Sequence, residues 1–355
     1  MEKHKVSIVC RCYNHEQTIQ EAINSVIKQS YTNWELIIID DCSTDNSVKI
    51  IDKFQDKRIK LYKNEINLGA IANLNKGFSL CNGDYICILD GDDMFLPEKL
   101  SKQVKFLDEN LDYGACFSYI RIKENPAIKK IKNFYQNLLN QPSGSREEML
   151  RKLFFNTNFL AFPTEMFRKE YIYDFPENII ATGDYNFHIN MLLKTKIKVL
   201  EEELIVYNIS NSNNHLSQLM TSLSNKIESL QLYESFLKIS DIELFKKIFD
   251  GYWNTYGEPS IETIPYFVAR IAIDNLKEQE IGLYLLSKIF ANKNYLKYIL
   301  ENTNMTYKNY LHIRMGNILY ADKIKKYKKL FNVFFILFII MLFLNIIQLI
   351  INFIF

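Results

Sequence analysis

The chain has 355 residues and a formal net charge of +2. This length suits two domains better than one, and the nearly balanced charge argues against a nucleic-acid protein held by bulk electrostatics. The six cysteines form no C-x-x-C pair, so we expect no zinc site, and free thiols suit a reducing cytoplasm.

Strand and helix patterns alternate four times over roughly the first 110 residues. Apolar runs rich in β-branched residues predict four strands, and helical spacing of apolar residues follows each of them. These strands are expected at residues 6–10, 34–39, 58–62 and 85–89. The alternation predicts an α/β fold with a doubly wound, mainly parallel sheet.

The pattern is weaker between residues 110 and 217. Alternating apolar residues predict strands at 113–122 and within 196–207. Residues 124–145 are expected to be irregular, with the basic patch Lys129–Lys132 as a solvated loop or, alternatively, a contact for an anionic ligand or lipid. Ser145 followed by Glu148 predicts a capping box at the start of a helix.

Three carboxylates follow the fourth predicted strand, where Asp90, Asp92 and Asp93 surround Gly91. Glycine permits a turn that other residues resist. Carboxylates crowded at the end of a strand repel one another, and Mg²⁺ or Mn²⁺ compensates this repulsion with one or two carboxylates and phosphate oxygens as ligands. The alternative interpretation is a solvated turn that leads into the next helix. Ligands of α/β sheets bind at this strand edge.

No G-x-G and no Gly-Lys-Ser/Thr occurs in the chain, so the dinucleotide fingerprint and the P-loop are absent. If a nucleotide diphosphate binds at the strand edge, a metal is the expected partner of its phosphates. Further along, Asp184 opens a helix pattern in Thr182–Tyr185. A plain helix N-cap is the alternative interpretation of this carboxylate.

The C-terminal third differs in character. Helical spacing with frequent aromatic residues indicates a helical region at 218–322, after a first domain at 1–217. Five lysines between 323 and 329 precede 26 uncharged residues, 330–355. At a rise of about 1.5 Å per residue, this run exceeds the ~30 Å hydrocarbon core of a bilayer. We therefore expect a C-terminal membrane segment at 323–355, with an oblique or re-entrant helix, or a buried helix of a soluble protein, as alternatives.

Four motifs lie in one order over about the first 110 residues: Val6–Glu16, Ile37–Asp45, Asn67–Gly69 and Leu89–Asp93. In this combination the chain resembles family 2 glycosyltransferases of the GT-A fold. The resemblance implies inverting transfer of a sugar from a nucleotide-diphosphate sugar, usually a UDP-sugar, with Mg²⁺ or Mn²⁺. Asp92 would ligate the metal, Asp90 would contact the metal or the ribose, and Asp184 would be the general base. The expected nucleotide-sugar contacts are Cys12, Tyr13, Asn14, Glu16, Asp41, Asn67 and Asp90.

Two stretches depart from this family's pattern. Arg11-Cys12 stand where the family commonly has Pro-Thr, which affects one wall of the nucleoside pocket. Ser210 stands where the family often has a histidine. His215 is a candidate substitute as a ligand of the diphosphate or the metal, and an ordinary loop histidine is the alternative.

The sequence therefore predicts a metal-dependent hexosyl- or N-acetylhexosaminyl-transferase of bacterial cell-envelope glycan biosynthesis. Its expected partners are a nucleotide-sugar donor and a polyprenyl-linked or other lipid-linked glycan acceptor. The tail predicts localisation at the cytoplasmic face of the inner (plasma) membrane, because the lysines precede the apolar run. The alternatives are a transferase for a soluble or protein acceptor, and a non-catalytic nucleotide-sugar-binding or scaffold protein.

Overall fold

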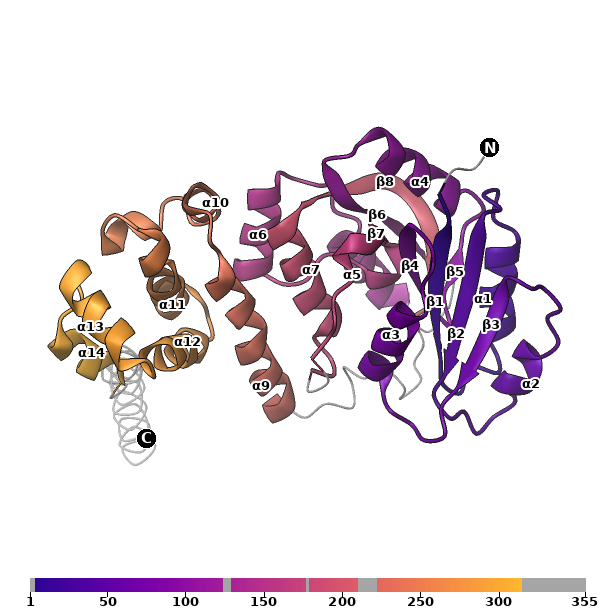
Figure 1. Cartoon of the computed structure of the whole chain (residues 1–355), viewed down its shortest axis with the longest axis horizontal. Coiled ribbons are helices and arrows are strands. Elements are labelled where there is room, and N and C mark those ends of the chain that lie inside the picture. Colours follow the sequence, from indigo (N-terminus) through magenta and orange to yellow (C-terminus); the bar gives the residue numbers. More distant parts are fainter. Residues whose placement is uncertain (1–3, 124–128, 177–178, 210–221, 315–355) are drawn as a thin grey trace, which may run out of the picture. The chain divides into compact units, whose positions relative to one another are not determined.

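The computed structural model describes residues 4–123, 129–176, 179–209 and 222–314. The described residues divide into two compact units, and the boundary lies between residues 251 and 252. Within the described residues, the first unit contains a sheet with helices on both faces, and the second is helical (Figure 1). The division into 1–217, 218–322 and 323–355 stays a prediction.

The sheet of the first unit has eight strands in the order β3-β2-β1-β4-β7-β6-β8-β5. They are β1 (Val6–Cys12), β2 (Trp34–Asp40), β3 (Ile59–Lys63), β4 (Tyr85–Asp90), β5 (Met94–Phe95), β6 (Tyr113–Ile122), β7 (Met166–Arg168) and β8 (Lys196–Tyr207). The first four strands of this order run parallel. The short strands β7 and β5 pair antiparallel with their neighbours, while β6 and β8 are parallel. The predicted parallel sheet is therefore confirmed for one half, and the other half is mixed.

The helices of the first unit follow the sequence expectation, with one exception. They are α1 (Ile19–Ile27), α2 (Ser47–Ile51), α3 (Ala70–Ser79), α4 (Lys99–Glu109), α5 (Lys129–Leu139), α6 (Arg146–Phe155), α7 (Gly183–Lys194), α9 (Ser222–Leu232) and α10 (Ile242–Ile248). Short 3₁₀ turns are η2 (Phe162–Thr164), η3 (Lys169–Tyr171) and η4 (Tyr233–Lys238). The predicted capping box of Ser145 and Glu148 is present at the start of α6.

The prediction of an irregular segment at 124–145 is wrong over Lys129–Leu139, where α5 forms. The basic patch Lys129–Lys132 lies at the start of this helix and not in a loop. Tyr135 and Leu139 lie one helical turn apart and pack against Ile120 and Ile122 of β6. The sequence does carry a signal for this helix, because apolar residues recur at helical spacing at positions 131, 134, 135, 138 and 139. The prediction gave too much weight to the lysines and missed this spacing.

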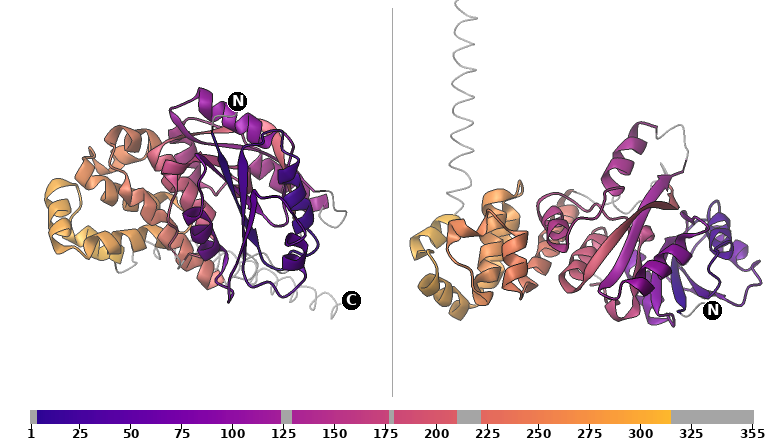
Figure 2. Two further views of the ribbon diagram at one scale, coloured as in Figure 1. Left: turned by 45° about the vertical axis from the view of Figure 1, so that its right-hand side comes forward. Right: turned by 90° about the horizontal axis from the view of Figure 1, so that it is seen from above.

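Alternate side chains of β1 are buried on opposite faces of the sheet. Val6, Ile8 and Cys10 belong to a buried cluster with α1 and α4. Val9 points to the opposite face, where α3 packs so closely that a Cβ on Gly77 would lie 2.3 Å from Val9 Cγ1. Figure 1 and Figure 2 show α1 and α3 on opposite sides of the parallel strands. Burial on both faces explains why these strands read as continuous apolar runs.

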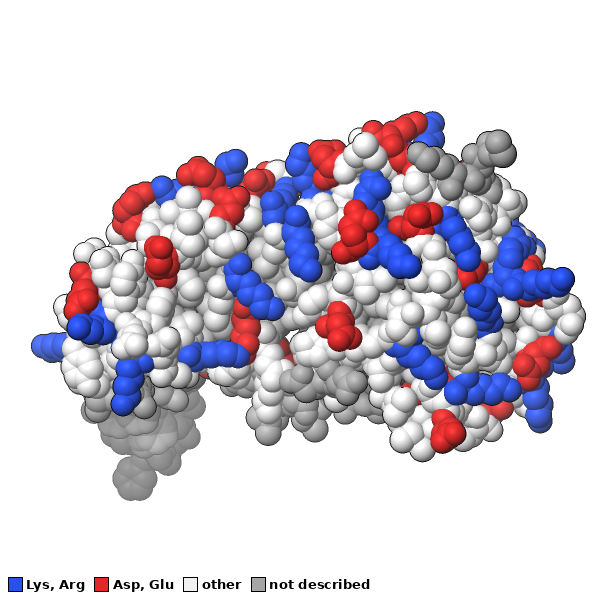
Figure 3. All heavy atoms as spheres, viewed as in Figure 1, with Lys and Arg blue, Asp and Glu red and all other residues white. Residues whose placement is uncertain are grey.

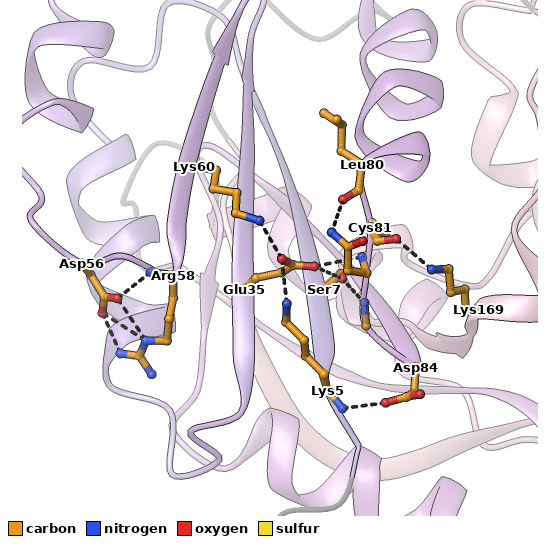
Figure 4. Close-up of polar contacts among 12 residues, drawn as sticks. Lys5, Ser7, Glu35, Asp56, Arg58, Lys60, Leu80, Cys81, Asp84 and Lys169 are labelled. Atoms are coloured by element: carbon orange, nitrogen blue, oxygen red, sulfur yellow. Dashed lines mark hydrogen bonds and ion pairs between the residues drawn. The ribbon is translucent and has the colours of Figure 1, made fainter.

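The amino-terminal edge of the sheet is held by Glu35, the second residue of β2 (Figure 4). Its carboxylate is 3% exposed and lies 2.8 Å from Lys5 Nζ and 3.1 Å from Lys60 Nζ. It also accepts hydrogen bonds from the Ser7 hydroxyl and the Asn82 N–H. Burial alone would raise the pKa of Glu35, but these four partners lower it to about 2. One carboxylate thus ties together strands β1, β2 and β3 and the turn before β4.

The second unit contains η5 (Trp253–Tyr256), η6 (Ile261–Thr263), α11 (Ile264–Asn275), α12 (Glu280–Phe290), α13 (Lys293–Asn302) and α14 (Tyr307–Arg314). The close approach of α11 and α12 requires glycine, because a Cβ on Gly282 would lie 2.4 Å from Ile273 N and 2.6 Å from Ala269 O. The predicted helical region is confirmed here.

Acidic and basic side chains are interspersed over the face shown in Figure 3, in keeping with the small net charge.

The expected localisation requires a correction. No helix within the described ranges is long and apolar enough to cross a membrane. This finding overturns the predicted placement at the cytoplasmic face of a membrane through a C-terminal helix. Residues 323–355, on which that prediction rested, lie outside the described residues.

A Glu35→Gln substitution should lower the free energy of unfolding by about 1–3 kcal/mol at pH 7, because hydrogen bonds to a charged group contribute about that much. The folded protein lowers the pKa of Glu35 to about 2. The stabilisation is therefore present above the unfolded pKa of ~4.3 and is lost as the pH falls through the folded value.

Urea unfolding of both proteins between pH 7 and pH 2 measures this effect. Wild type and variant should approach one another as the pH falls to 2, where Glu35 is half protonated in the folded protein and neutral in the unfolded one. The matched control is Glu109→Gln at a side chain that is 63% exposed, with a change within about 0.5 kcal/mol. A difference that persists unchanged at pH 2 would contradict the role of the charge.

Candidate active site

The carboxyl ends of β1, β2 and β4 meet at one edge of the sheet. In the parallel register, Cys12 pairs with Asp40, and Arg11 pairs with Asp90. The segments that follow these strands carry most of the residues predicted from the sequence. The structure therefore brings the first, second and fourth motifs together, as the strand order requires.

The loops that follow β1 and β2 interlock through side chain to backbone hydrogen bonds. Thr44 N–H donates to Asn14 Oδ1 at 2.8 Å, and Asn46 N–H donates to Glu16 Oε2 at 3.0 Å. In the other direction, Glu16 N–H donates to Asp45 Oδ2 at 2.9 Å. Asn14 has a φ of 55°, a left-handed conformation that asparagine adopts more readily than most residues. Asn14 and Glu16 thus fix the backbone of both loops.

Asp41 fixes a third loop, which lies between β3 and α3. Asp41 is only 3% exposed. It accepts hydrogen bonds from Asn64 Nδ2 at 2.9 Å, Leu68 N–H at 2.8 Å and Gly69 N–H at 2.9 Å. Asn67 lies exposed on the loop that these bonds hold. The predicted nucleotide-sugar contact of Asp41 would therefore come from a carboxylate that already organises the surrounding backbone.

Arg11 pairs with Asp90 across the two adjacent strand ends. Its Nε lies 2.7 Å from Asp90 Oδ1, and a second guanidinium nitrogen contacts the same oxygen. Both bonds end on Oδ1, so the guanidinium does not engage Oδ2 of Asp90. The Arg11 side chain is 22% exposed and Asp90 is 26% exposed. The charge of Arg11 also acts on Asp92 and Asp184, so one cation serves three carboxylates.

The three predicted acids separate into two kinds. Asp93 is 2% exposed and accepts a hydrogen bond from Asn208 N–H at 2.8 Å. Burial, with the nearby charges of Asp92 and Asp90, raises the pKa of Asp93 well above its ordinary value. Asp90 and Asp92 remain partly exposed. Within the described part of the chain, no group of three or more His, Cys, Asp or Glu side chains could hold a metal, so the predicted cluster reduces to two acids.

Glycine is required at position 91 because a larger residue would not fit there. Its backbone angles are ones that other residues also adopt. A Cβ at this position would lie 2.2 Å from His15 Nδ1 and 3.0 Å from Arg11 O. Thr18 Oγ1 donates to the Gly91 carbonyl at 2.8 Å, which holds the turn against the start of α1. The turn between Asp90 and Asp92 is therefore packed directly beneath the loop that follows β1.

Asp184 lies in the first turn of α7, where Thr182 occupies the N-cap position. The N-cap interpretation is therefore wrong for Asp184 itself. Its Oδ1 accepts from Tyr185 N–H at 2.7 Å, and its Oδ2 accepts from Asn158 Nδ2 at 3.1 Å. Burial raises the pKa of Asp184 to about 6, although these bonds and the charge of Arg11 oppose the shift. A carboxylate with this pKa can exchange a proton near neutral pH.

Three residues near these acids were not predicted from the sequence. Arg11 was noted only as a departure from the family pattern, and its pairing with Asp90 was not foreseen. Asn158 carried no sequence signal. Tyr207 ends β8, where burial and then the charges of Asp93 and Asp90 raise the pKa of its hydroxyl well above the ordinary value. Tyr207 therefore lies beside the same group of carboxylates.

The remaining predicted residues differ in accessibility. Cys12 is 1% exposed, and burial followed by the charge of Asp40 raises the pKa of its thiol to about 12. Tyr13 is 42% exposed, so its ring is open to a ligand. His215 lies outside the described residues. The nucleoside contacts expected of Cys12, Tyr13 and the other loop residues stay predictions.

The start of α7 depends on a distant carboxylate. Glu228 of α9 is 4% exposed. It accepts hydrogen bonds from the N–H groups of Ile180, Ala181 and Thr182 at 2.9, 2.9 and 3.0 Å. A negative charge at a helix N-terminus also interacts favourably with the helix dipole. Glu228 thus fixes the segment that delivers Asp184 to the strand edge.

Comparison with known proteins identifies the family. The profile of the family described as Glycosyl transferase family 2 matches residues 7–175. An uncharacterised glycosyltransferase of Methanocaldococcus jannaschii is 34% identical over 227 residues, which cover 62% of this chain and 76% of that protein. The chain therefore belongs to glycosyltransferase family 2.

Two further proteins are similar. WfgD of Escherichia coli, named as a UDP-Glc:alpha-D-GlcNAc-diphosphoundecaprenol beta-1,3-glucosyltransferase, is 41% identical over 130 residues, which cover 37% of this chain and 51% of WfgD. The structure of Staphylococcus aureus TarS 1–349 with UDP-GlcNAc has a TM-score of 0.57 at 19% identity, and covers 89% of this chain and 92% of TarS 1–349. The second likeness confirms the α/β glycosyltransferase fold.

We expect Glu228→Gln to lower the free energy of unfolding by about 1–3 kcal/mol. The amide nitrogen of glutamine would replace one carboxylate oxygen, and it cannot accept a hydrogen bond from the backbone N–H groups that this oxygen now satisfies. Chemical denaturation measures the change. The matched control is Glu243→Gln, the same chemical change at an exposed position in the first turn of α10, with an effect within about 0.5 kcal/mol. Equal effects of the two substitutions would show that Glu228 contributes nothing specific.

Proposed function

We propose that this glycosyltransferase transfers a sugar from a UDP-sugar to a hydroxyl group of a glycan acceptor, with inversion and with Asp184 as the general base. The observation that carries this proposal is the placement of Asp184. It is a partly buried carboxylate whose pKa is raised to about 6, and the charges of Arg11 and Asp90 act on it from the strand edge. General bases are effective when their pKa lies near the working pH.

The reaction is a single in-line displacement. Asp184 takes the proton of the acceptor hydroxyl, whose oxygen forms a bond to the anomeric carbon of the donor sugar. The bond from that carbon to the diphosphate oxygen breaks, and its electron pair leaves with UDP. A single displacement inverts the configuration at the anomeric carbon. This scheme needs one base on the acceptor side and positive charge on the diphosphate side.

The interlocked loops support the proposed donor site. Asn14, Glu16 and Asp41 fix three loops at the carboxyl edge of the sheet, and Tyr13 offers an exposed ring that can stack on a base. WfgD is named as using UDP-Glc, and TarS was solved with UDP-GlcNAc. These names favour UDP as the nucleotide and a hexosyl or N-acetylhexosaminyl residue as the sugar.

The two exposed acids are the proposed metal ligands. Asp92 and Oδ2 of Asp90 would hold Mg²⁺ or Mn²⁺, since Mg²⁺ in such enzymes takes one or two carboxylates and completes its shell with phosphate oxygens and water. A bound metal would neutralise charge on the departing diphosphate. Asp93 does not fit this role, because its carboxylate is buried and bonded to Asn208 N–H.

We propose a lipid-linked glycan as the acceptor. The support is the name of WfgD, whose acceptor is a GlcNAc residue on a diphosphoundecaprenol. In this proposal Asp184 of α7 faces the acceptor hydroxyl, and Asp90 and Asp92 at the end of β4 face the diphosphate.

The test is UDP release from a panel of UDP-sugars, including UDP-glucose and UDP-GlcNAc, with wild type and Asp184→Asn. We expect the substitution to lower kcat by roughly 10²–10⁴-fold, as is typical when a general base is lost, with unchanged affinity for UDP. The kcat of wild type should rise with pH to a plateau above about 6, where Asp184 is ionised. Near-normal turnover in the variant would refute the role of Asp184.

Stability separates catalysis from structure in this variant. A raised folded pKa means that the contribution of Asp184 to stability is present below the unfolded pKa of ~3.9 and is lost as the pH rises through about 6. At pH 7.5, the neutral Asp184→Asn variant should therefore melt no lower than wild type.

Metal dependence gives a separate prediction. Chelation with EDTA should abolish UDP release, and Mn²⁺ or Mg²⁺ should restore it. Asp92→Asn should raise the Mn²⁺ concentration needed for half-maximal activity and lower the rate, with a change in unfolding free energy within about 0.5 kcal/mol. The matched control is Asp112→Asn at a side chain that is 59% exposed. Full activity in excess EDTA would disprove the proposed metal role.

A further inference from the structure

A buried acid and a buried histidine face each other behind the candidate base. Glu165 stands between η2 and β7, and His188 lies one helical turn after Asp184 in α7. Both side chains are 0% exposed, and Glu165 Oε2 lies 3.3 Å from His188 Nε2. Within the described part of the chain, neither oxygen of this carboxylate accepts a regular hydrogen bond. Two buried titratable groups in this state require an explanation.

The other ring nitrogen of His188 leads to Asp184. His188 Nδ1 lies 3.1 Å from Asn158 Oδ1, and Asn158 Nδ2 donates to Asp184 Oδ2 at 3.1 Å. Leu160 N–H also donates to Asn158 Oδ1, at 3.2 Å. This bond fixes which way the amide points, because Leu160 N–H needs an oxygen acceptor. His188 Nδ1 must therefore carry hydrogen, since two acceptors at 3.1 Å would repel one another.

The charges around the pair favour one proton distribution. Burial raises the pKa of Glu165 well above its ordinary value, and burial lowers the pKa of His188 to about 3. A neutral Glu165 can then donate its proton to His188 Nε2, while His188 Nδ1–H points toward Asn158. The other charges that act on Glu165 are Lys99, which lowers its pKa, and Asp184, which raises it.

Lys99 and two aromatic rings also lie beside the pair. Lys99 is itself buried, and its Nζ donates to Gln103 Oε1 at 2.6 Å and to the carbonyl oxygen of Glu165 at 3.3 Å. The rings of Phe117 and Phe162 lie 5.2 and 5.8 Å from the His188 ring. Even if Lys99 favours an ionised Glu165 beside a protonated His188, Nδ1 still donates to Asn158.

We propose that Glu165 and His188 are positioning residues, which orient Asn158 so that its amide N–H groups point at the carboxylate of Asp184. In this network each donor points toward Asp184: a proton on Glu165 faces His188 Nε2, His188 Nδ1–H faces Asn158 Oδ1, and Asn158 Nδ2 donates to Asp184 Oδ2. This inference rests on the proposed function of Asp184 as the base.

The arrangement serves the base in two ways. A donor on Oδ2 and the Tyr185 N–H on Oδ1 hold the carboxylate in one orientation, which leaves its remaining lone pairs for the acceptor hydroxyl. The same donors favour the ionised form. They therefore limit the rise in pKa that burial causes, and keep the base ionised at neutral pH.

Four variants of the full-length chain test the network. His188→Phe keeps an aromatic ring but removes both nitrogens, and Glu165→Leu removes the donor to His188 Nε2. Glu165→Gln is the conservative variant, because its amide N–H can still donate to that nitrogen. Ile37→Val, in a fully buried position of β2, is a control that lowers the melting temperature without touching the network.

The readout is the titration of the Asp184 carboxyl carbon by ¹³C NMR, with aspartate labelled at Cγ and the signal assigned by its loss in Asp184→Asn. This measurement needs neither donor nor acceptor. His188→Phe and Glu165→Leu should raise the midpoint by about one pH unit, because the ionised form loses an oriented donor. Glu165→Gln and Ile37→Val should retain the wild-type midpoint.

Kinetics provide the second readout. With UDP-GlcNAc or UDP-glucose as donor, the acid limb of the kcat profile should move to higher pH in His188→Phe and Glu165→Leu, with KM for the donor unchanged. Unmoved midpoints and acid limbs in both variants would overturn the inference. If His188→Phe does not fold, the comparison of Glu165→Leu with Glu165→Gln decides the question.

Failure of this inference is distinguishable from failure of the proposed function. Turnover of a UDP-sugar with an Asp184 titration that ignores Glu165 and His188 refutes the network alone. A titration that follows these residues, together with UDP-sugar turnover that Asp184→Asn leaves unchanged, refutes the role of Asp184 as a base and with it the proposed purpose of the network.

Discussion

Negative charge gathered at the carboxyl ends of parallel strands is the constraint on which the site depends. The structure resolves it differently for each acid. Asp90 pairs with Arg11, Asp93 is withdrawn into the core and bonded to Asn208 N–H, and Asp184 receives neutral donors. A nucleotide diphosphate would add further negative charge at this edge, so binding it requires positive charge beyond the single guanidinium of Arg11.

The two edges of the same sheet use carboxylates for opposite purposes. At the amino edge, Glu35 meets two lysines, so its pKa falls and the charge becomes a permanent link between strands. At the carboxyl edge, the direct partners of Asp184 are an amide and a backbone N–H, and burial raises its pKa. The charge of the partners, more than burial itself, separates a structural acid from one that can exchange a proton near neutral pH.

Local pattern explains what could be predicted from the sequence. Strands β1, β2 and β4 are continuous apolar runs that end in polar motifs, so both their conformation and the shared edge follow from a few residues each. The membrane placement is the clear error. It rested on the apolar run and the lysines before it, and no described helix is long and apolar enough to span a bilayer. Contacts between distant residues left no local signal. Arg11 and Asp90 are 79 positions apart, and Thr182 and Glu228 are 46 apart.

The bonds of Glu228 have a consequence for where this enzyme can be divided. The family profile ends at residue 175, yet the carboxylate that completes the start of α7 comes from α9. A fragment that ends before residue 228 leaves three N–H groups without their acceptor beside the candidate base. A chimera with a relative should likewise take α7 and α9 from the same parent, since a foreign α9 without a matching carboxylate would loosen the start of α7 while the loops after β1 and β2 stay intact.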